Sequence, residues 1–325
     1  MKNSTQLISY TTRLSANKEE FAIVLNIFES LFRDIMLFRL GRQDLLQNKN
    51  LIIMNLNDEK SLPAGRSEGG CPLNIIKVGG AVVEDETQLS RLLNDFSAVE
   101  GKKVLVHGGG RRATKVAASL GIETKMVNGR RVTDADMLEV VTMVYGGLVN
   151  KNLVARLQAA GVNALGLTGA DVDVIRSHKR PLKNGIDYGF VGDVDKADGK
   201  MLATLIEAGI TPVMAPLTHD GLGYILNTNA DTIAAETAKA LAPYYDVTLT
   251  FCFEKKGVLS NPDDDNSVIP VITRDDFKRY VADGTIAGGM IPKIENALDA
   301  IMAGVKKVVI TKADALGNSE GTVIV

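Results

Sequence analysis

Apolar runs and amphipathic segments alternate along the chain from residue 75 to its end. Short apolar runs bounded by glycine or polar residues are typical of buried strands, whereas apolar residues that recur every three or four positions are typical of helices. Strands are predicted at 75–78, 104–106, 163–167, 211–215, 247–252 and 307–310, with short edge or hairpin strands at 188–195 and 222–227. Helices are predicted at 86–99, 111–120, 134–159, 199–208, 230–241, 274–282 and 292–303. This order predicts an α/β fold in which a mainly parallel sheet is covered by helices on both faces.

The first 73 residues follow a different pattern. One helix is predicted from Asn17 to Leu40, because apolar residues recur along it at helical spacing and make a wide face. The stretch 61–70 is rich in glycine and contains a proline, as linkers are. A helix this apolar must be buried, either by docking or by oligomerisation. The alternative is that translation begins later, at Met54, so that the protein lacks this helix. Both alternatives stay open at this stage.

Composition and charge narrow the class of protein. A length of 325 residues allows one large or two medium domains, and 45% hydrophobic with 23% charged residues is ordinary for a globular protein. With a formal net charge of −2, the chain lacks the excess of basic residues that is typical of nucleic-acid-binding proteins. Cys71 and Cys252 form neither a metal-binding spacing nor a disulfide framework, and no apolar run is long enough for a membrane span. A cytoplasmic protein with no nucleic-acid or membrane partner is therefore expected.

Two predicted strands run straight into glycines. Lys77-Val78-Gly79-Gly80 ends the first, and His107-Gly108-Gly109-Gly110 ends the next. Glycine allows positive φ and lets backbone N–H groups approach a ligand closely, so two such loops on neighbouring strands can cradle a phosphate, with Lys77 beside them. For either loop taken alone, a plain turn is the alternative. The glycine patterns of the Walker loop and of the dinucleotide-binding fingerprint are both absent.

Three further segments place polar residues next to predicted helices. Within 128–133, a turn is followed by two arginines just before a helix. Their forked guanidinium groups suit a carboxylate, although a solvated surface pair is the alternative. Asn227 and Asn229 alternate on an extended segment before Asp231, which offers amides and a carboxylate unless one of these residues only caps the helix. Lys293 follows a pair of glycines just inside a helix N-terminus, where a cation opposes the helix dipole, which indicates another task.

One motif points to a different class of enzyme. Residues 317–321 fit the pattern G-x-S-x-G, and His-Gly-Gly-Gly occurs in esterase oxyanion loops. The nucleophile elbow of such a hydrolase requires a helix after the serine and a histidine later in the chain. Six residues follow Ser319 and none of them is histidine, which argues against a serine hydrolase.

Taken together, the motifs resemble those of the amino acid kinase family over residues 74–325. They are K-x-G-G at 77–80, H-G-G-G at 107–110, N-G-x-R-V-T at 128–133, N-x-N-A-D at 227–231 and G-M-x-x-K at 289–293. Each motif is weak alone, but five in the family order are specific. The resemblance implies a three-layer α/β/α sandwich of the carbamate kinase-like type with two lobes. An acyl-amino-acid lobe is expected at 74–245 and an ATP lobe at 246–325, after an N-terminal extension at 1–73.

The resemblance implies that ATP phosphorylates the γ-carboxylate of an N-acylated L-glutamate, an early step of arginine biosynthesis. Arg131 and Asn227 would hold the α-carboxylate of this substrate, with Gly109 and Gly110 also on the substrate side. The acyl group, acetyl or succinyl, stays open, because residues 215–217 lack the small hydroxyl residues more usual in the family.

For phosphoryl transfer, the resemblance places Lys77 and Lys293 on opposite sides of the phosphoryl group, with Asp231 between them. The backbone N–H groups that cradle the phosphoryl group would come from Gly79, Gly80, Gly108 and Gly109. Mg²⁺ would arrive with ATP, held mostly by phosphates and water rather than by a protein metal site. Glu254 stands where the family usually has aspartate, and Lys255 where it has valine, which affects contacts on the adenosine side.

Two other functions remain in view. A non-catalytic sensor of arginine or another amino acid could use the same fold, although a pure binder needs no pair of lysines for transition-state charge. A kinase of another small carboxylate is the third hypothesis, and Arg131 with Asn227 disfavours it by demanding an α-carboxylate. A homodimer or higher homo-oligomer is expected.

Overall fold

The structure is a computed structural model, and it describes residues 70–127, 130–182, 185–288, 290–316 and 321–325. The predicted helix over 17–40 and the linker before residue 70 lie outside the described residues. The same holds for Asn128, Gly129 and Gly289, and for most of the G-x-S-x-G motif.

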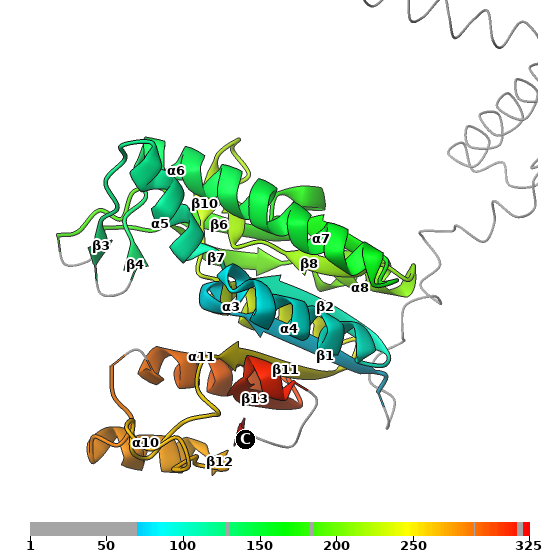
Figure 1. The fold of residues 1–325 in the computed structure, drawn as a ribbon, viewed down its shortest axis with the longest axis vertical. Coiled ribbons are helices and arrows are strands. Elements are labelled where there is room, and N and C mark those ends of the chain that lie inside the picture. The colour runs from blue at the N-terminus through cyan, green and yellow to red at the C-terminus, as the bar shows by residue number, and fades with distance from the viewer. Residues whose placement is uncertain (1–69, 128–129, 183–184, 289, 317–320) are drawn as a thin grey trace, which may run out of the picture. The chain divides into compact units, whose positions relative to one another are not determined.

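A mainly parallel sheet forms the centre of the described chain (Figure 1). Its neighbouring strands, in order, are β12 (Val271–Ile272), β14 (Thr322–Ile324), β13 (Lys307–Lys312), β11 (Asp246–Phe253), β1 (Pro72–Val78), β2 (Lys102–His107), β8 (Thr211–Met214) and β5 (Ala164–Leu167). Among these strands, only β13 and β14 pair antiparallel. The six main strands predicted from the sequence are confirmed, with bounds that differ by a few residues.

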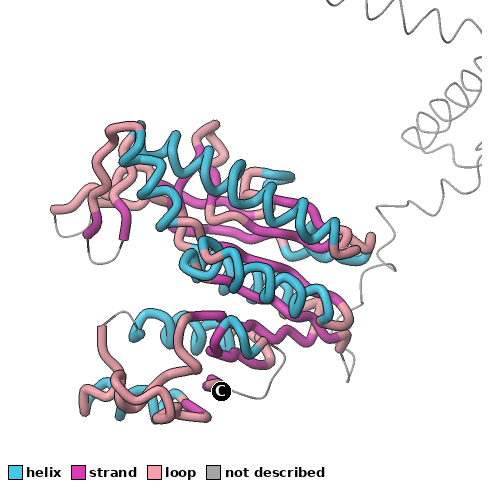
Figure 2. The backbone as a smooth tube through the Cα atoms, viewed as in Figure 1, coloured by secondary structure: helices cyan, strands magenta, loops and turns pink. Residues whose placement is uncertain are grey.

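Helices cover both faces of this sheet, as predicted. Side chains of β1 alternate between the faces: Leu73 and Ile75 join one apolar core, and Ile76 and Val78 join the other. The first core is closed by α8 (Gly199–Glu207), α9 (Ala230–Leu241), α10 (Arg274–Ala282) and α11 (Met290–Met302). The second is closed by α4 (Glu86–Ala98), α5 (Gly110–Ser119), α6 (Ala135–Val141) and α7 (Asn150–Ala159). Figure 2 shows these helices alongside the strands, and the predicted three-layer arrangement is confirmed.

Smaller elements flank the sheet beyond its carboxyl edge, and several of them differ from prediction. A second sheet has the order β10 (Ile225–Asn227), β9 (Leu217–His219), β6 (Ile175–Lys179) and β7 (Gly192–Ala197). β6 and β9 were not predicted, because both carry polar residues in a short span. Arg130 and Arg131, which follow the turn expected at 128–129, form β4, the second strand of a hairpin with β3 (Met126–Val127) that was not predicted. A short helix, α3 (Gly80–Glu84), was also not predicted.

The segment predicted as one helix over 134–159 is helical throughout, but its middle is a π-helix. Between α6 and α7, η3 (Thr142–Val149) follows the wider π geometry. Asn150, the first residue of α7, donates its backbone N–H to the carbonyl of Tyr145, five residues earlier. Apolar periodicity cannot reveal this change, because both kinds of helix bury a similar stripe. π-helical turns of this kind are frequent at functional sites.

Candidate active site at the carboxyl edge of the sheet

Lys77 and Asp231 form a buried ion pair at the end of β1. The Lys77 Nζ lies 2.6 Å from Asp231 Oδ1, and the side chains are 8% and 15% exposed. Asp231 is in the first turn of α9, where Asn229 caps the helix by accepting the Asp231 backbone N–H at 2.7 Å. Lys77 has this neighbour because alternation along β1 turns it toward the face that α9 covers. The helix start therefore presents its carboxylate to the strand lysine.

Lys293 joins this pair from α11. Its Nζ lies 3.5 Å from the centre of the Phe253 ring, and the Lys77 Nζ lies 5.1 Å from the same centre. Burial lowers the pKa of Lys293 below its ordinary range; Asp231 opposes this shift and Lys77 adds to it. The structure thus brings Lys77, Asp231 and Lys293, which are far apart in sequence, into one cluster, and the Phe253 ring lies against both lysines.

The first glycine loop (Gly79–Gly80) and the second glycine loop (Gly108–Gly110) lie against each other. A Cβ on Gly108 would lie 3.1 Å from the Gly80 nitrogen, and a Cβ on Gly109 would lie 2.8 Å from the Tyr145 ring. Both distances are shorter than ordinary Cβ contacts, so a side chain at either position would force its neighbour to shift. The expected use of positive φ is wrong, however, because Gly79 has φ −72° and Gly109 has φ 179°. Close backbone approach is the reason for glycine here.

Arg131 lies beside the second glycine loop. One of its guanidinium nitrogens donates to the Gly110 carbonyl at 2.9 Å and to the Thr114 hydroxyl at 2.8 Å. Asn227, nearly buried in β10, donates its side-chain amide to the Thr133 hydroxyl at 2.9 Å. Because Thr133 follows Arg131 by two residues, the hairpin segment connects the arginine with the asparagine.

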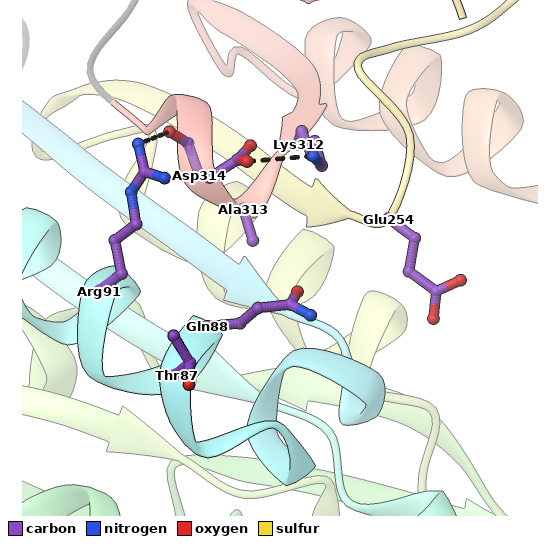
Figure 3. Close-up of a pocket in the computed structure, with 7 residues that line it drawn as sticks. All are labelled: Thr87, Gln88, Arg91, Glu254, Lys312, Ala313 and Asp314. Atoms are coloured by element: carbon purple, nitrogen blue, oxygen red, sulfur yellow. Dashed lines mark hydrogen bonds and ion pairs between the residues drawn. The ribbon is translucent and has the colours of Figure 1, made fainter.

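A pocket of about 360 Å³ opens at the carboxyl ends of β11 and β13, next to α4 (Figure 3). It is lined by Thr87, Gln88, Arg91, Glu254, Lys312, Ala313 and Asp314. Lys312 pairs with Asp314 at 3.0 Å, and Arg91 donates to the Asp314 carbonyl at 3.3 Å. Glu254 pairs with Arg111 at 2.8 Å on the exposed surface. The pocket contains none of the clustered residues Lys77, Asp231 and Lys293.

Sequence reasoning missed several residues of the site. Phe253 lies one position past the predicted strand at 247–252, and its ring contacts both lysines. Tyr145 contacts the second glycine loop from a helix whose π geometry has no sequence signal. Asn150 hydrogen-bonds to His107, which was read only as part of a glycine motif. A histidine that ends an otherwise apolar strand was the signal available for that contact.

Comparison with known proteins identifies the class. A profile of the Amino acid kinase family matches residues 72–312. The chain belongs to the amino acid kinase family. Within it, the chain is 70% identical over 250 residues to the acetylglutamate kinase of Bacteroides thetaiotaomicron, which covers 77% of this chain and 97% of the relative. It is 39% identical over 255 residues to the acetylglutamate kinase of Methanopyrus kandleri, covering 78% and 100% of the two chains.

Solved structures agree on the fold. The structure of smu.665 from Streptococcus mutans UA159 superimposes with a TM-score of 0.63 at 33% identity, over 78% of this chain and 98% of that one. Carbamate kinase from Giardia lamblia gives a TM-score of 0.55 at 16% identity, over 79% and 99% of the two chains, and shows the fold alone. Every helix among the described residues is too short or too polar to cross a bilayer.

Proposed function

We propose that this chain transfers the γ-phosphoryl group of ATP to the γ-carboxylate of N-acetyl-L-glutamate, a step of arginine biosynthesis. The observation that carries the proposal is the cluster of Lys77, Asp231 and Lys293 at the end of β1, the strand that leads into the first of two adjoining glycine loops. The identity to acetylglutamate kinases over nearly their whole length supports the choice of substrate. A carboxylate acceptor also fits this cluster, because an ionised carboxylate needs no general base and the Asp231 carboxylate is held in an ion pair with Lys77.

The proposed chemistry needs alignment and charge neutralisation. The acceptor carboxylate is already ionised and nucleophilic, so phosphoryl transfer asks for an in-line approach and for donors around the transferring group. Lys77 and Lys293 supply two positive charges, and Asp231 orients them. The cradle of N–H groups is assigned to Gly79, Gly80 and Gly109. Gly108, which the sequence also suggested, is not included, because its N–H donates to the Val78 carbonyl at 3.0 Å. Mg²⁺ would arrive with ATP, held mostly by the phosphates and water, and would help to neutralise the charge of the phosphates.

We assign substrate recognition to residues on and next to the β3–β4 hairpin. Both terminal nitrogens of the Arg131 guanidinium donate to protein groups in this structure, so the α-carboxylate would replace some of these hydrogen bonds when it binds the fork. Asn227 offers an amide to the same carboxylate. Gly109 and Gly110 add backbone contacts to the same end of the substrate. Residues 74–245 would then form the acyl-amino-acid lobe and residues 246–325 the nucleotide lobe. We assign the enzyme to the cytoplasm and expect it to assemble as a homodimer or higher homo-oligomer.

The test is ATP-dependent formation of an acyl phosphate, trapped with hydroxylamine, on N-acetylglutamate and N-succinylglutamate in parallel. Activity on N-acetylglutamate is the expected result, and greater activity on the succinyl compound would reassign the acyl group. Silence on both compounds, in a folded protein that still binds ATP, would favour a sensor or a kinase of another carboxylate.

Two adjacent arginines allow a matched test of the residue that binds the α-carboxylate of the substrate. Arg131→Lys is expected to raise KM for the acylglutamate by about 10-fold or more, because lysine cannot reproduce a bidentate contact. Arg130→Lys changes an exposed neighbour on the same strand and should leave KM within about 2-fold. Equal effects of the two substitutions would contradict the assignment of the α-carboxylate to Arg131.

A further inference from the structure

We infer that His107 and Asn150 are positioning residues that fix the second glycine loop, and that the π-helix η3 is the device that brings Asn150 to it. The inference deepens the proposed function and rests on it. Neither side chain would touch ATP or the acylglutamate. Their effect would pass through the peptide groups of Gly108 and Gly109.

The hydrogen bonds of His107 define which ring nitrogen carries the proton. His107 ends β2 and is fully buried. Its Nδ1 lies 2.9 Å from the Gly108 carbonyl oxygen, which can only accept, so Nδ1 is the protonated nitrogen. Its Nε2 is then an acceptor, and it accepts a hydrogen bond from the Asn150 side-chain amide at 3.1 Å. The ring is therefore held from both sides.

Asn150 is itself fixed in one orientation. Its amide nitrogen also donates to the Val213 carbonyl at 2.9 Å, so both N–H bonds are used. Its Oδ1 accepts from Lys151 Nζ at 3.1 Å, and that ammonium also donates to the Gly166 carbonyl at 3.0 Å. The chain of bonds thus runs from strands β5 and β8, through Asn150 and His107, to the second glycine loop.

His107 acts by orientation rather than by proton transfer. Burial lowers the pKa of His107 to about 4, so the ring is neutral near pH 7. In a trans peptide the carbonyl of Gly108 and the N–H of Gly109 point in opposite directions within one plane. Holding the carbonyl toward the protein interior therefore directs the Gly109 N–H away from it. The Gly109 and Gly110 nitrogens lie 3.5 Å from a Cβ built on Gly80, which places them beside the first glycine loop.

The π-helix explains how one helix reaches this loop twice. Tyr145 packs on Gly109, and Asn150 reaches Gly108 through His107. In an α-helix, residues five apart differ in direction by about 140° and face different sides. In η3 the Asn150 backbone N–H bonds to the Tyr145 carbonyl, so the two residues stack one turn apart on the same side. One wide turn thus supports two consecutive residues of the second glycine loop.

Two substitutions at His107 separate its two hydrogen bonds. His107→Asn places an amide near the former Nδ1 and keeps a donor for the Gly108 carbonyl. His107→Gln places its amide near the former Nε2, keeps a partner for Asn150 and leaves the Gly108 carbonyl unpaired. We expect His107→Gln to lower kcat by about 10- to 100-fold, since small misplacements of aligned groups have effects of this size. His107→Asn should keep kcat within about 5-fold of wild type, with KM for ATP little changed in both.

Lys103 provides the control for stability. It lies on β2 at the end opposite His107, and its buried ammonium donates to the carbonyls of Phe96, Ser97 and Val99 at 2.8–2.9 Å. Lys103→Met should lower Tm as much as the His107 variants do, while kcat below the unfolding transition stays near wild type. A kcat that simply follows Tm across the three variants would indicate a structural role only and would overturn the inference.

A second readout does not depend on activity. Hydrogen–deuterium exchange of the peptide that spans residues 107–113 should be faster in His107→Gln than in His107→Asn, and unchanged in Lys103→Met. Silence of the wild-type enzyme on acylglutamates would refute the proposed function, and exchange would then decide the positioning of the loop by itself. Equal exchange in the two His107 variants would refute the positioning in either case.

Discussion

Lys293 and Phe253 form a close cation–π contact, with Nζ 3.5 Å from the ring centre, and the same ring lies 5.1 Å from Lys77 Nζ. A ring face attracts an ammonium without neutralising it. The negative charges of Asp231 and Glu254 also act on Lys293, but a direct ion pair with either would have to be displaced by the phosphate. Phe253 therefore places two positive charges side by side and leaves the charge of Lys293 available for a nucleotide.

Replacing this ring should impair catalysis. Phe253→Leu keeps an apolar side chain but removes the attraction of the ring face, so Lys293 loses its fixed position over β11. Cation–π contacts of this kind contribute about 0.5–2 kcal/mol, which corresponds to a fall in kcat/KM for ATP of roughly 2- to 30-fold. Steady-state kinetics with varied ATP would measure it.

The control for that variant is Phe251→Leu on the same strand. Phe251 is stacked on Phe253 with ring centres 6.1 Å apart and is buried in the core. Its substitution should lower the free energy of unfolding more than Phe253→Leu does, yet reduce kcat/KM less. An unchanged or increased kcat/KM in Phe253→Leu would show that the ring does not assist Lys293.

Replacing either lysine should reduce kcat to a similar extent, but the two replacements should differ in their effect on the stability of the protein. Lys77→Ala and Lys293→Ala each remove one positive donor, and a fall in kcat of about 10²- to 10³-fold is expected for each. Lys77→Ala also leaves Asp231 buried without its ion-pair partner, which costs about 3–5 kcal/mol of unfolding free energy. Urea unfolding combined with single-turnover rates would separate the two effects.

A double variant checks the reason for that difference. In Lys77→Ala with Asp231→Asn, the unpaired charge is gone, so stability should recover in part while kcat stays low. A lysine variant that retains wild-type kcat would refute its catalytic role. Equal stability of the two single variants would contradict the importance of the buried pair.

Local patterns in the sequence were sufficient for the main strands and helices of the sheet. The strand β1 could be located from its apolar run and its bounding glycines, and α9 from Asn229 at its cap. The contact of Phe253 with Lys293 could not be predicted, because it depends on how α11 packs over the end of β11. The π geometry of η3 was equally hidden, since it changes hydrogen-bond partners and not the apolar stripe. Long-range packing thus decides the parts of the site that local patterns leave open.

Val172 adopts a backbone conformation that should be costly. Its φ of 46° and ψ of 28° lie in the left-handed region, where a β-branched side chain is strongly disfavoured, and its side chain is 58% exposed. Val172→Gly removes the strain and loses little burial. We expect the free energy of unfolding to rise by about 1 kcal/mol, measured by urea denaturation.

Asp173 supplies the matched comparison for Val172. It also has positive φ, at 56°, but its carboxylate accepts hydrogen bonds from Arg176 and His219. Asp173→Gly would relieve similar strain and lose those contacts, so its net effect should be smaller or destabilising. Loss of stability in Val172→Gly would show that the exposed valine side chain makes a favourable contribution that outweighs the strain of its backbone conformation.

The buried His107 should make stability depend on pH in mildly acidic solution. Burial lowers the pKa of His107 to about 4, the hydrogen bond to Gly108 opposes this shift, and nearby Lys151 adds to it. In the unfolded chain, histidine titrates near its ordinary pKa of about 6.5. Between these two values the unfolded state binds a proton that the folded state does not. The stability from this group is therefore complete above about pH 6.5 and is lost as pH falls toward 4.

The size of the effect is about 3 kcal/mol at most, from the difference between the two pKa values. Urea unfolding of wild type and His107→Gln at pH 7, 5.5 and 4.5 would measure it, since carboxylates titrate alike in both proteins and cancel in the difference. The gap in unfolding free energy between the two proteins should narrow steadily as pH falls, because only wild type carries the histidine. A gap that stays constant over this range would mean that His107 titrates alike in the folded and unfolded chain, which would be incompatible with a ring held neutral between Gly108 and Asn150.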